Sequence, residues 1–387
     1  MIPVRYNLRS LFVRKVTTLM TVVSIAFVVL VFVGVWSLAV GLEAAFAASG
    51  DPRTVLVTRD GARSETESFV DRDGYRLVAT LPGVERDVDG EMLASGELVV
   101  IQIFSRADGS EANVTVRGVE PAARVVRPAW TLVEGRDFTP GTGEIIVGQR
   151  LVGRYPDLAL GGTVRFGRRD FTVVGVFTAD GGGPESEVWG ALTDIGAAFR
   201  REGGVSSIRL KTTSEASTAA LVTAATDIQR YRLQAKREDQ YYAEQTDAST
   251  AQFKILGTIL AIMMGFGACF AAANTMYAQV SSRAREIGTL RAIGFRRRHV
   301  LLAFLAEAAL LGLLGGLLGC VLAIPLDGIS AGTTNFITFS EIAFELTLSP
   351  QLMAMGVLLA IATGVLGGLP PAIAASRRGI SGLLREA

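Results

Sequence analysis

The segment Ser281–Gly319, SSRAREIGTLRAIGFRRRHVLLAFLAEAALLGLLGGLLG, joins a short arginine-rich stretch to a long apolar one. It begins at the end of the uncharged run Ile255–Ser282. Its apolar part continues to Leu326, with Glu307 as the one charged residue. A helix rises about 1.5 Å per residue, so about 20 apolar residues cross the ~30 Å hydrocarbon core of a bilayer. The arginine-rich stretch therefore lies between two predicted membrane spans.

Two more uncharged runs, Val16–Leu42 and Leu346–Ser376, bring the predicted spans to four. The clustering carries this prediction, because 49% hydrophobic residues and a net charge of +1 would also suit a soluble protein. The predicted transmembrane helices are 16–42, 255–280, 300–326 and 351–375. Between and around them lie an amphipathic segment at 1–15, an extracytoplasmic domain at 43–254, a cytoplasmic helix and loop at 281–299, a short external loop at 327–350 and a tail at 376–387.

The basic residues predict the orientation, because Lys and Arg gather at cytoplasmic ends of membrane spans. They precede the first span, fill the loop after the second and follow the fourth, whereas the long segment after the first span is richer in acidic residues. We expect an inner-membrane protein with both termini in the cytoplasm. A removed signal peptide is the alternative, since Ala45-Phe46-Ala47 resembles a cleavage site. The 27-residue apolar run exceeds the usual ~7–15 and favours an uncleaved span.

The long segment after the first span predicts an α+β domain of two subdomains. Short β-rich runs separated by glycines are typical of strands. They are Thr54–Thr58, Glu97–Ser105, Asn113–Val119, Glu144–Gly148, Thr163–Phe166, Asp170–Phe177 and Ser207–Lys211. A helix is expected over Ser214–Leu233, with Ser214 as its cap. The predicted fold is thus an α-helical membrane protein with four transmembrane helices and this domain inserted between helices 1 and 2.

The sequence offers little catalytic or metal-binding chemistry. Its one histidine, His299, lies among arginines, and its two cysteines, Cys269 and Cys320, fall inside apolar spans. The pairs Asp71/Asp73 and Asp87/Asp89 are flanked by arginines, as in solvated turns. No Gly-x-x-x-x-Gly-Lys-Ser/Thr motif occurs, so we expect no ATP hydrolysis by this chain. We therefore predict no catalytic residue, no metal and no bound cofactor, and no nucleic-acid partner.

The loop after the second span has more structure than a string of arginines. Residues Ser281–Phe295 suit a helix lying at the membrane surface, with Gly294 as its stop. Ile287, Leu290 and Gly294 recur at helical spacing, and Arg283 can pair with Glu286. The candidate contact residues for a cytoplasmic partner are Arg283, Arg285, Glu286, Ile287, Gly288, Leu290, Arg291, Ala292, Gly294 and Phe295.

These motifs resemble the permeases of the FtsX/MacB family of ABC transporters. The resemblance rests on Arg285-Glu286-Ile287-Gly288, on Leu290–Gly294, on Glu307 and on the glycine-rich third span. Asn7–Ser10, Leu132–Phe138, Asp170–Val176 and Gly368–Ala372 add to it. The sequence differs at Gly379-Ile380-Ser381, where the family commonly has a proline-led turn, and it shows no fused ATPase domain.

The resemblance implies a permease that transmits ATP-driven movement to its periplasmic domain. Its implied partners are a separate cytoplasmic ATPase, which would hold ATP and Mg, a second permease copy as homodimer or heterodimer, the bilayer, and a periplasmic adaptor. The implied task is export or extrusion of a lipid-linked, peptide or drug-like substrate. Two other classes stay open: an FtsX-type regulator that activates an external cell-wall hydrolase or other partner, and an ATP-independent membrane receptor.

Glu307 and six glycines are the candidate residues inside the spans. A carboxylate in a span is costly without a partner. We expect Glu307 to hydrogen-bond to the cytoplasmic helix or to the first span and to couple the two. Glycines four apart allow close helix packing, within one copy or across a dimer. They form the pairs Gly312/Gly316, Gly315/Gly319 and Gly364/Gly368.

Overall fold

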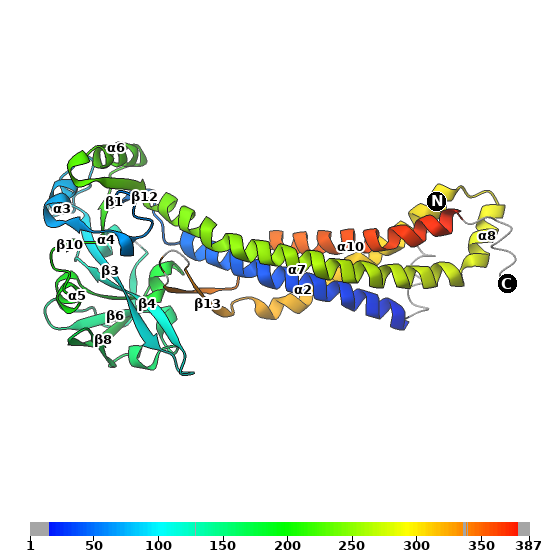
Figure 1. Cartoon of the computed structure of the whole chain (residues 1–387), viewed down its shortest axis with the longest axis horizontal. Helices are drawn as coiled ribbons and strands as arrows, with labels where there is room; N and C mark the ends of the chain where they lie inside the picture. Colours follow the sequence, from blue (N-terminus) through cyan, green and yellow to red (C-terminus); the bar gives the residue numbers. More distant parts are fainter. Residues whose placement is uncertain (1–14, 128, 336–337, 339, 378–387) are drawn as a thin grey trace. The chain divides into compact units, whose positions relative to one another are not determined.

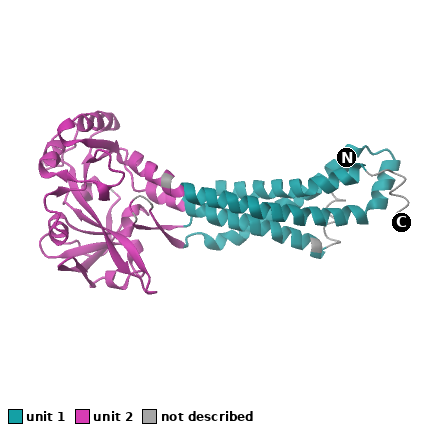
Figure 2. Cartoon of the chain, viewed as in Figure 1, with its two compact units in different colours: residues 1–40, 251–329, 346–387 teal, residues 41–250, 330–345 magenta. Residues whose placement is uncertain are grey.

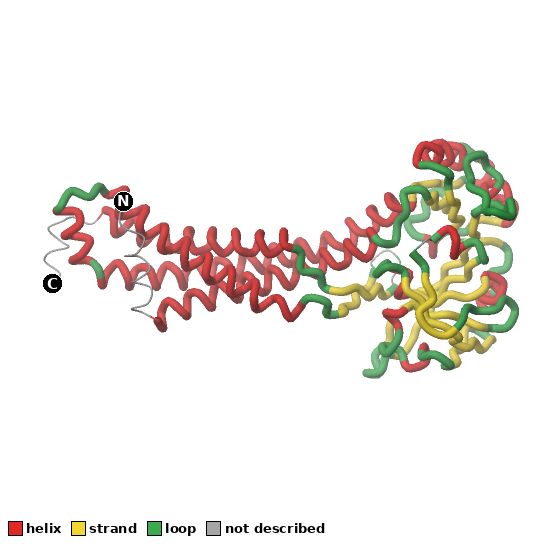
Figure 3. Tube along the Cα trace, turned by 180° about the vertical axis from the view of Figure 1, so that it is seen from behind, coloured by secondary structure: helices red, strands yellow, loops and turns green. Residues whose placement is uncertain are grey.

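The structure is a computed structural model that describes residues 15–127, 129–335, 338 and 340–377. It divides into two compact units, coloured in Figure 2. The helical unit comprises 1–40, 251–329 and 346–387, and the α/β unit comprises 41–250 and 330–345. Figure 3 shows long helices in the first and most of the strands in the second. The predicted amphipathic segment and the tail beyond Arg377 lie outside the described residues.

Four helices of the described chain are long and apolar enough to cross a membrane, as the sequence predicted. They are α2 (Lys15–Ala47), α7 (Glu238–Ser282), α9 (Arg297–Ala323) and α10 (Pro350–Arg377), labelled in Figure 1 except for α9, which lies between α8 and η6 (Ile324–Leu326) in the chain. Helices α2 and α7 extend beyond the apolar runs. The apolar pattern predicts only the membrane-spanning part of a helix. The prediction therefore missed the polar first turns of α7, which begins at Glu238.

The α/β unit is built on one ten-stranded sheet, in the order β12-β1-β11-β3-β4-β9-β6-β8-β5, with β7 paired to β8. The strands are β1 (Thr54–Arg59), β3 (Ala94–Ser105), β4 (Glu111–Val119), β5 (Thr131–Gly135), β6 (Glu144–Gly148), β7 (Thr163–Phe166), β8 (Arg169–Thr178), β9 (Glu187–Ala191), β11 (Ser207–Lys211) and β12 (Leu233–Arg237). All seven predicted strands are present. Strands β5, β9 and β12 were missed.

Three hydrophobic clusters lie in the described part of the α/β unit. The first contains Leu98, Val116 and Phe171, the second contains Val57 and Leu210, and the third contains Phe177 and Trp189. The 12-residue strand β3 supplies Leu98 to the first and Ala94 to the second. In place of the two predicted subdomains, the described residues form one compact unit built on a single main sheet.

Two predictions for this unit need correction. The helix expected over Ser214–Leu233 is α6 (Glu215–Thr226), and it ends early because Leu233 starts the edge strand β12. Its cap is confirmed, since Ser214 accepts a hydrogen bond from the Ser217 N–H. The short external loop predicted at 327–350 contains the hairpin of β13 (Ser330–Thr334) and β14 (Glu341–Glu345), which belongs to the α/β unit.

Candidate functional site

The arginine-rich segment forms the short helix α8 (Ala284–Ala292), which follows α7 after Arg283. It ends at a turn in which Gly294 has φ +107°, a conformation that suits glycine. Its inner face is Ile287 and Gly288, which are buried. Ile287 packs against Met276 of α7 and Phe304 of α9. A single apolar face therefore seats α8 on the helical unit.

The other face of α8 is open to solvent. Arg285, Glu286, Thr289 and Ala292 are exposed, and Ile293 just beyond the helix is 73% exposed. Leu290, Arg291 and Phe295 are half-buried, while Gly294 is exposed in the turn instead of sharing the buried face with Ile287. We name the five exposed residues the α8 outer face. It combines charged side chains with one large apolar side chain.

Glu307 is buried inside the helical unit and is 1% exposed. The Arg283 guanidinium donates to its carboxylate over 3.2 Å, which links the start of α8 to the first turns of α9. Two residues that the sequence analysis singled out separately are thus brought together. A buried carboxylate of this kind is stabilised by its cationic partner, and either residue alone would be costly. The hydrogen bond predicted from Glu307 to the segment carrying α8 is present.

The candidate glycines lie where the long helices approach most closely. A Cβ on Gly312 would lie 2.5 Å from the Ala360 carbonyl oxygen, and one on Gly364 would lie 2.6 Å from the Ala308 oxygen. Gly316 of α9 likewise faces α10, and Gly368 of α10 faces α9. On another face of α9, Gly315 and Gly319 lie against Ile25, Ala26 and Val29 of α2. All six thus contact helices of the same chain.

The sequence analysis missed a buried charge cluster in the α/β unit, made of Glu65, Glu97, Glu187, Glu238, Arg117, Arg127 and Arg209. Arg117 donates to Glu97 at 2.8 Å, to Glu187 at 2.7 Å and to Glu65 at 2.9 Å. Glu97 is fully buried and also accepts from Arg127 and Arg209. A signal existed in the sequence, since residues 97, 117 and 209 each place a charge inside an apolar strand.

Electrostatics keep Glu65 and Glu97 of this cluster ionised. Burial alone would raise the pKa of Glu97, but the charges of Arg127, Arg209 and Arg117 outweigh it and lower that pKa to about 2. Burial likewise opposes ionisation of Glu65, whose pKa is nevertheless held well below its ordinary value by Arg117 and Arg209. Each carboxylate depends on its arginines, because an unpaired charge in this interior would be strongly unfavourable.

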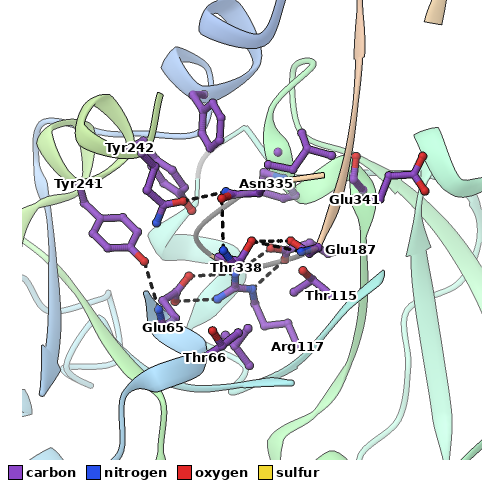
Figure 4. Close-up of a pocket in the computed structure, with 18 residues that line it drawn as sticks. Glu65, Thr66, Thr115, Arg117, Glu187, Tyr241, Tyr242, Asn335, Thr338 and Glu341 are labelled. Carbon is purple, nitrogen blue, oxygen red and sulfur yellow. Dashed lines mark hydrogen bonds and ion pairs between the residues drawn. The ribbon is translucent and has the colours of Figure 1, made fainter. Parts of the chain in front are cut away.

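The cluster also holds the beginning of α7. Glu238, the first residue of the helix, accepts from Arg209 Nε at 2.8 Å. One turn on, the Tyr241 hydroxyl accepts from the Glu65 N–H at 3.2 Å, and the Tyr242 hydroxyl accepts from Arg209 at 3.2 Å. Figure 4 shows Tyr241 directed toward Glu65, and Arg117 beside Glu65. The first turn of α7 is therefore bound to the sheet by charged and phenolic groups.

The cavity in Figure 4 lies beside this cluster and has a volume of about 50 Å³. It is lined by polar residues including Glu65, Arg117, Glu187 and Asn335. A drug-sized ligand needs about 300–1,000 Å³, so this cavity suits a few water molecules at most.

Across the described residues no group of three or more His, Cys, Asp or Glu could hold a metal ion. The two aspartate pairs form turns: Asp71 caps a helix through the Gly74 N–H, and Asp87 accepts from the Asp89 N–H.

The hairpin β13–β14 attaches to the α/β unit through Glu341, which is 7% exposed. Its carboxylate accepts from Arg106 Nη2 at 2.6 Å and from Arg154 Nη2 at 2.5 Å, and also from the Tyr155 hydroxyl. The hairpin lies in the chain between α9 and α10. Glu341 therefore binds the hairpin to Arg106, Arg154 and Tyr155 of the same unit.

Replacing Glu341 with alanine should release this hairpin. Arg106 and Arg154 would be left without their carboxylate, and removing one partner of a buried pair costs about 3–5 kcal/mol. We expect hydrogen exchange of the β14 backbone to rise strongly, while the strands on the far side of the sheet stay protected. Glu111→Ala, at an exposed glutamate on β4, is the control. Equal protection of β14 in the Glu341 variant and the control would contradict this role.

Two family models match the chain. The MacB-like periplasmic core domain matches residues 16–228, and the FtsX-like permease C-terminal model matches residues 258–380. The macrolide export ATP-binding/permease protein MacB of Hyphomonas neptunium is 25% identical over 365 residues, covering 84% of this chain and 54% of the relative. The pyoverdine export ATP-binding/permease protein PvdT of Pseudomonas syringae is 28% identical over 315 residues, covering 74% and 46%.

The chain spans about half the length of these curated relatives. Among solved structures, the periplasmic region of MacB from Actinobacillus actinomycetemcomitans matches with a TM-score of 0.38 and 12% identity, over 51% of this chain and 94% of that chain.

Proposed function

Because the chain belongs to the family with a MacB-like periplasmic core domain, we propose that it is the permease subunit of an ABC transporter driven by a separate cytoplasmic ATPase. The match of residues 258–380 to the FtsX-like permease C-terminal model supports this assignment. In this proposal both termini and α8 face the cytoplasm and the α/β unit faces the periplasm. ATP and Mg bind to the ATPase, and two permease copies act with two ATPases.

The observation that carries the proposal is that α8 has one buried face and one exposed face. Its inner face, Ile287 and Gly288, is buried in the helical unit, and its outer face is exposed. A small helix held by one apolar face moves with the body to which it is attached. Docking of the α8 outer face in a groove of the ATPase would therefore pass movement of the ATPase to the membrane helices.

We propose that α7 carries this movement onward. Its last residues lie next to α8 in the chain, and its first turn is bound to the sheet of the α/β unit through Glu238, Tyr241 and Tyr242. The helix is continuous over 45 residues between these ends. A continuous helix that is anchored at one end and attached to α8 at the other can transmit displacement.

The substrate class of this transporter belongs to the same proposal. The names of two relatives refer to macrolide export and pyoverdine export. We propose export or extrusion of a lipid-linked, peptide or drug-like substrate, with a periplasmic adaptor as a further partner. An FtsX-type regulator, which activates an external hydrolase, uses the same movement and is the second candidate.

Glu307 tests the coupling step. In Glu307→Ala, Arg283 loses its buried carboxylate, so α8 is no longer tied to α9 by this pair. We expect the ATPase to bind but its stimulation by the permease to fall roughly 2- to 30-fold, since residues along a coupling route change coupling by about 0.5–2 kcal/mol. The measurement is ATP hydrolysis by the reconstituted complex, with Glu307→Gln as the conservative variant that retains a hydrogen-bond acceptor. Full stimulation and transport by Glu307→Ala would remove this role.

A further inference from the structure

Another cavity of the α/β unit lies between the short helices α3 (Arg72–Ala79) and α5 (Leu192–Phe199). Strand β10 (Gly204–Val205), which Figure 1 labels between these helices, forms part of its wall. Its volume is about 480 Å³, within the range of about 300–1,000 Å³ that is usual for small-molecule sites. We name it the α3–α5 cavity, and its lining includes Arg72, Tyr75, Glu120, Leu192, Arg201 and Val205.

Different hydrophobic clusters hold the walls of this cavity. Val78 of α3 and Val205 of β10 belong to the second cluster, whereas Ile195 of α5 belongs to the first. Leu192, at the start of α5, packs against both clusters and also lines the cavity. A ligand between α3 and α5 would therefore bridge the two clusters.

One part of the lining is already fixed by hydrogen bonds. The Tyr75 hydroxyl donates to the Glu120 carboxylate over 2.5 Å, and the Gly96 N–H donates to the same oxygen over 2.9 Å. Burial and the charge of Glu120 raise the pKa of Tyr75, so the phenol keeps its proton and continues to donate. The Glu120 carboxylate thus has two donors from the chain itself.

Three guanidinium groups line the cavity, those of Arg72, Arg76 and Arg201. Arg76 lies 4.0 Å from Asp73, but both side chains are largely exposed, so this pair contributes little. Within the part of the chain that the structure describes, Arg72 and Arg201 have no ion-pair partner, although Arg201 is half-buried. Glu202 is the other carboxylate of the lining and is exposed. The cations outnumber the carboxylates, which favours an anionic ligand.

The lining joins these charges to apolar surface from Leu192, Val205 and the ring of Tyr75. Guanidinium groups pair with carboxylate or phosphate oxygens through parallel hydrogen bonds. We propose that the α3–α5 cavity binds a small organic anion, whose carboxylate or phosphate group is held by Arg72 and Arg201. Its apolar part packs on Leu192 and Val205. This inference goes beyond the proposed function and applies to both candidate functions, because it concerns the α/β unit alone.

Naphthalene probes that differ in charge test the proposal: 2-naphthoate, 2-naphthylmethanol and 2-naphthylmethylamine. Binding to the full chain in lipid nanodiscs is measured by isothermal titration calorimetry, with empty nanodiscs as the blank. We expect saturable binding of 2-naphthoate, and roughly 10-fold weaker binding of the alcohol and the amine, because hydrogen bonds to a charged group are lost. A parallel titration with 2-naphthyl phosphate shows which acid group is preferred. Equal affinity for the amine, or no saturable binding of either acid, would overturn the proposal.

Substitutions locate the binding at this cavity. Arg72→Glu reverses one charge, and a glutamate in the first turn of α3 suits a helix N-terminus, so folding is preserved. Thr193→Trp fills the cavity from an exposed position of α5. We expect each variant to weaken 2-naphthoate binding by roughly 10-fold or more. The matched controls Arg168→Glu and Thr223→Trp, at exposed positions outside the lining, should bind as the unmodified chain does.

Hydrogen exchange gives an independent readout of the binding position. Addition of 2-naphthoate to the unmodified chain should slow exchange in α3 and α5, and the same addition to Arg72→Glu should not. Equal binding by Arg72→Glu, Thr193→Trp and their controls would show that the probe lies elsewhere and would contradict the proposal. Slowed exchange confined to other elements would have the same meaning.

Discussion

Replacing Glu97 with alanine should lower the free energy of unfolding of the α/β unit by about 3–5 kcal/mol, the usual cost of removing one partner from a buried ion pair. Glu97 is fully buried and accepts hydrogen bonds from Arg117, Arg127 and Arg209. Its loss leaves three guanidinium groups to share the remaining carboxylates of the cluster. Because most domains are stable by only about 5–15 kcal/mol, this single change removes a large part of the total.

The tryptophans make the measurement specific to the α/β unit. The chain has three, and Trp189 lies in that unit with its indole N–H donating to Glu187 of the charge cluster. Chemical unfolding followed by fluorescence in a Trp36→Phe background therefore reports on the α/β unit. Glu111→Ala is the matched control and should change stability by less than about 0.5 kcal/mol. Equal stabilities of the Glu97 variant and this control would show that the cluster is not needed for folding.

Gly364→Leu should prevent α9 and α10 from packing together. Even a Cβ at this position would lie 2.6 Å from the Ala308 carbonyl oxygen and 3.1 Å from the Gly312 Cα, and both are backbone atoms that cannot move aside. Overpacking of this kind costs about 1–3 kcal/mol and more when backbones must separate. We expect a strong loss of folded, monodisperse protein in detergent, measured by size-exclusion chromatography.

The control for this prediction is Ala362→Leu, which adds similar volume on the same helix at an exposed position. It should yield as much folded protein as the unmodified chain. Full yield of Gly364→Leu would mean that α9 and α10 do not pack through their glycines.

The sequence was sufficient to predict the four spans and seven of the strands, because hydropathy and alternation are local properties. It also identified the glycines and Glu307, since glycine and carboxylate are informative inside an apolar run. The sequence could not show that Gly315 and Gly319 face α2 while Gly312 and Gly316 face α10, because that depends on how the helices cross.

The partners within the charge cluster, and the place of the hairpin, could not be predicted from the sequence. Residues 97, 117 and 209 each place a charge inside an apolar strand, but Glu65 and these three residues are far apart in the sequence, and only the pairing of the strands brings them together. Glu341 stands in a segment too short and too polar to predict as part of the α/β unit. The helix predicted over Ser214–Leu233 rests on Leu221, Ala224, Ala225 and Ile228 at helical spacing, and its predicted end, Leu233, is the first residue of β12.

Recovery of the ATPase through the α8 outer face is the most direct test of the central claim. Gly288 is buried, so substitution there would also disturb the helical unit, whereas Arg285 and Ile293 are exposed. The tagged chain carrying Arg285→Glu and Ile293→Glu is purified from native membranes, and the co-purifying ATP-binding subunit is quantified by mass spectrometry. Arg165→Glu with Val133→Glu, at exposed positions of the α/β unit, is the matched control. The account predicts that the α8 variant loses most of the ATPase while the control retains it; equal recovery with both variants would contradict the account.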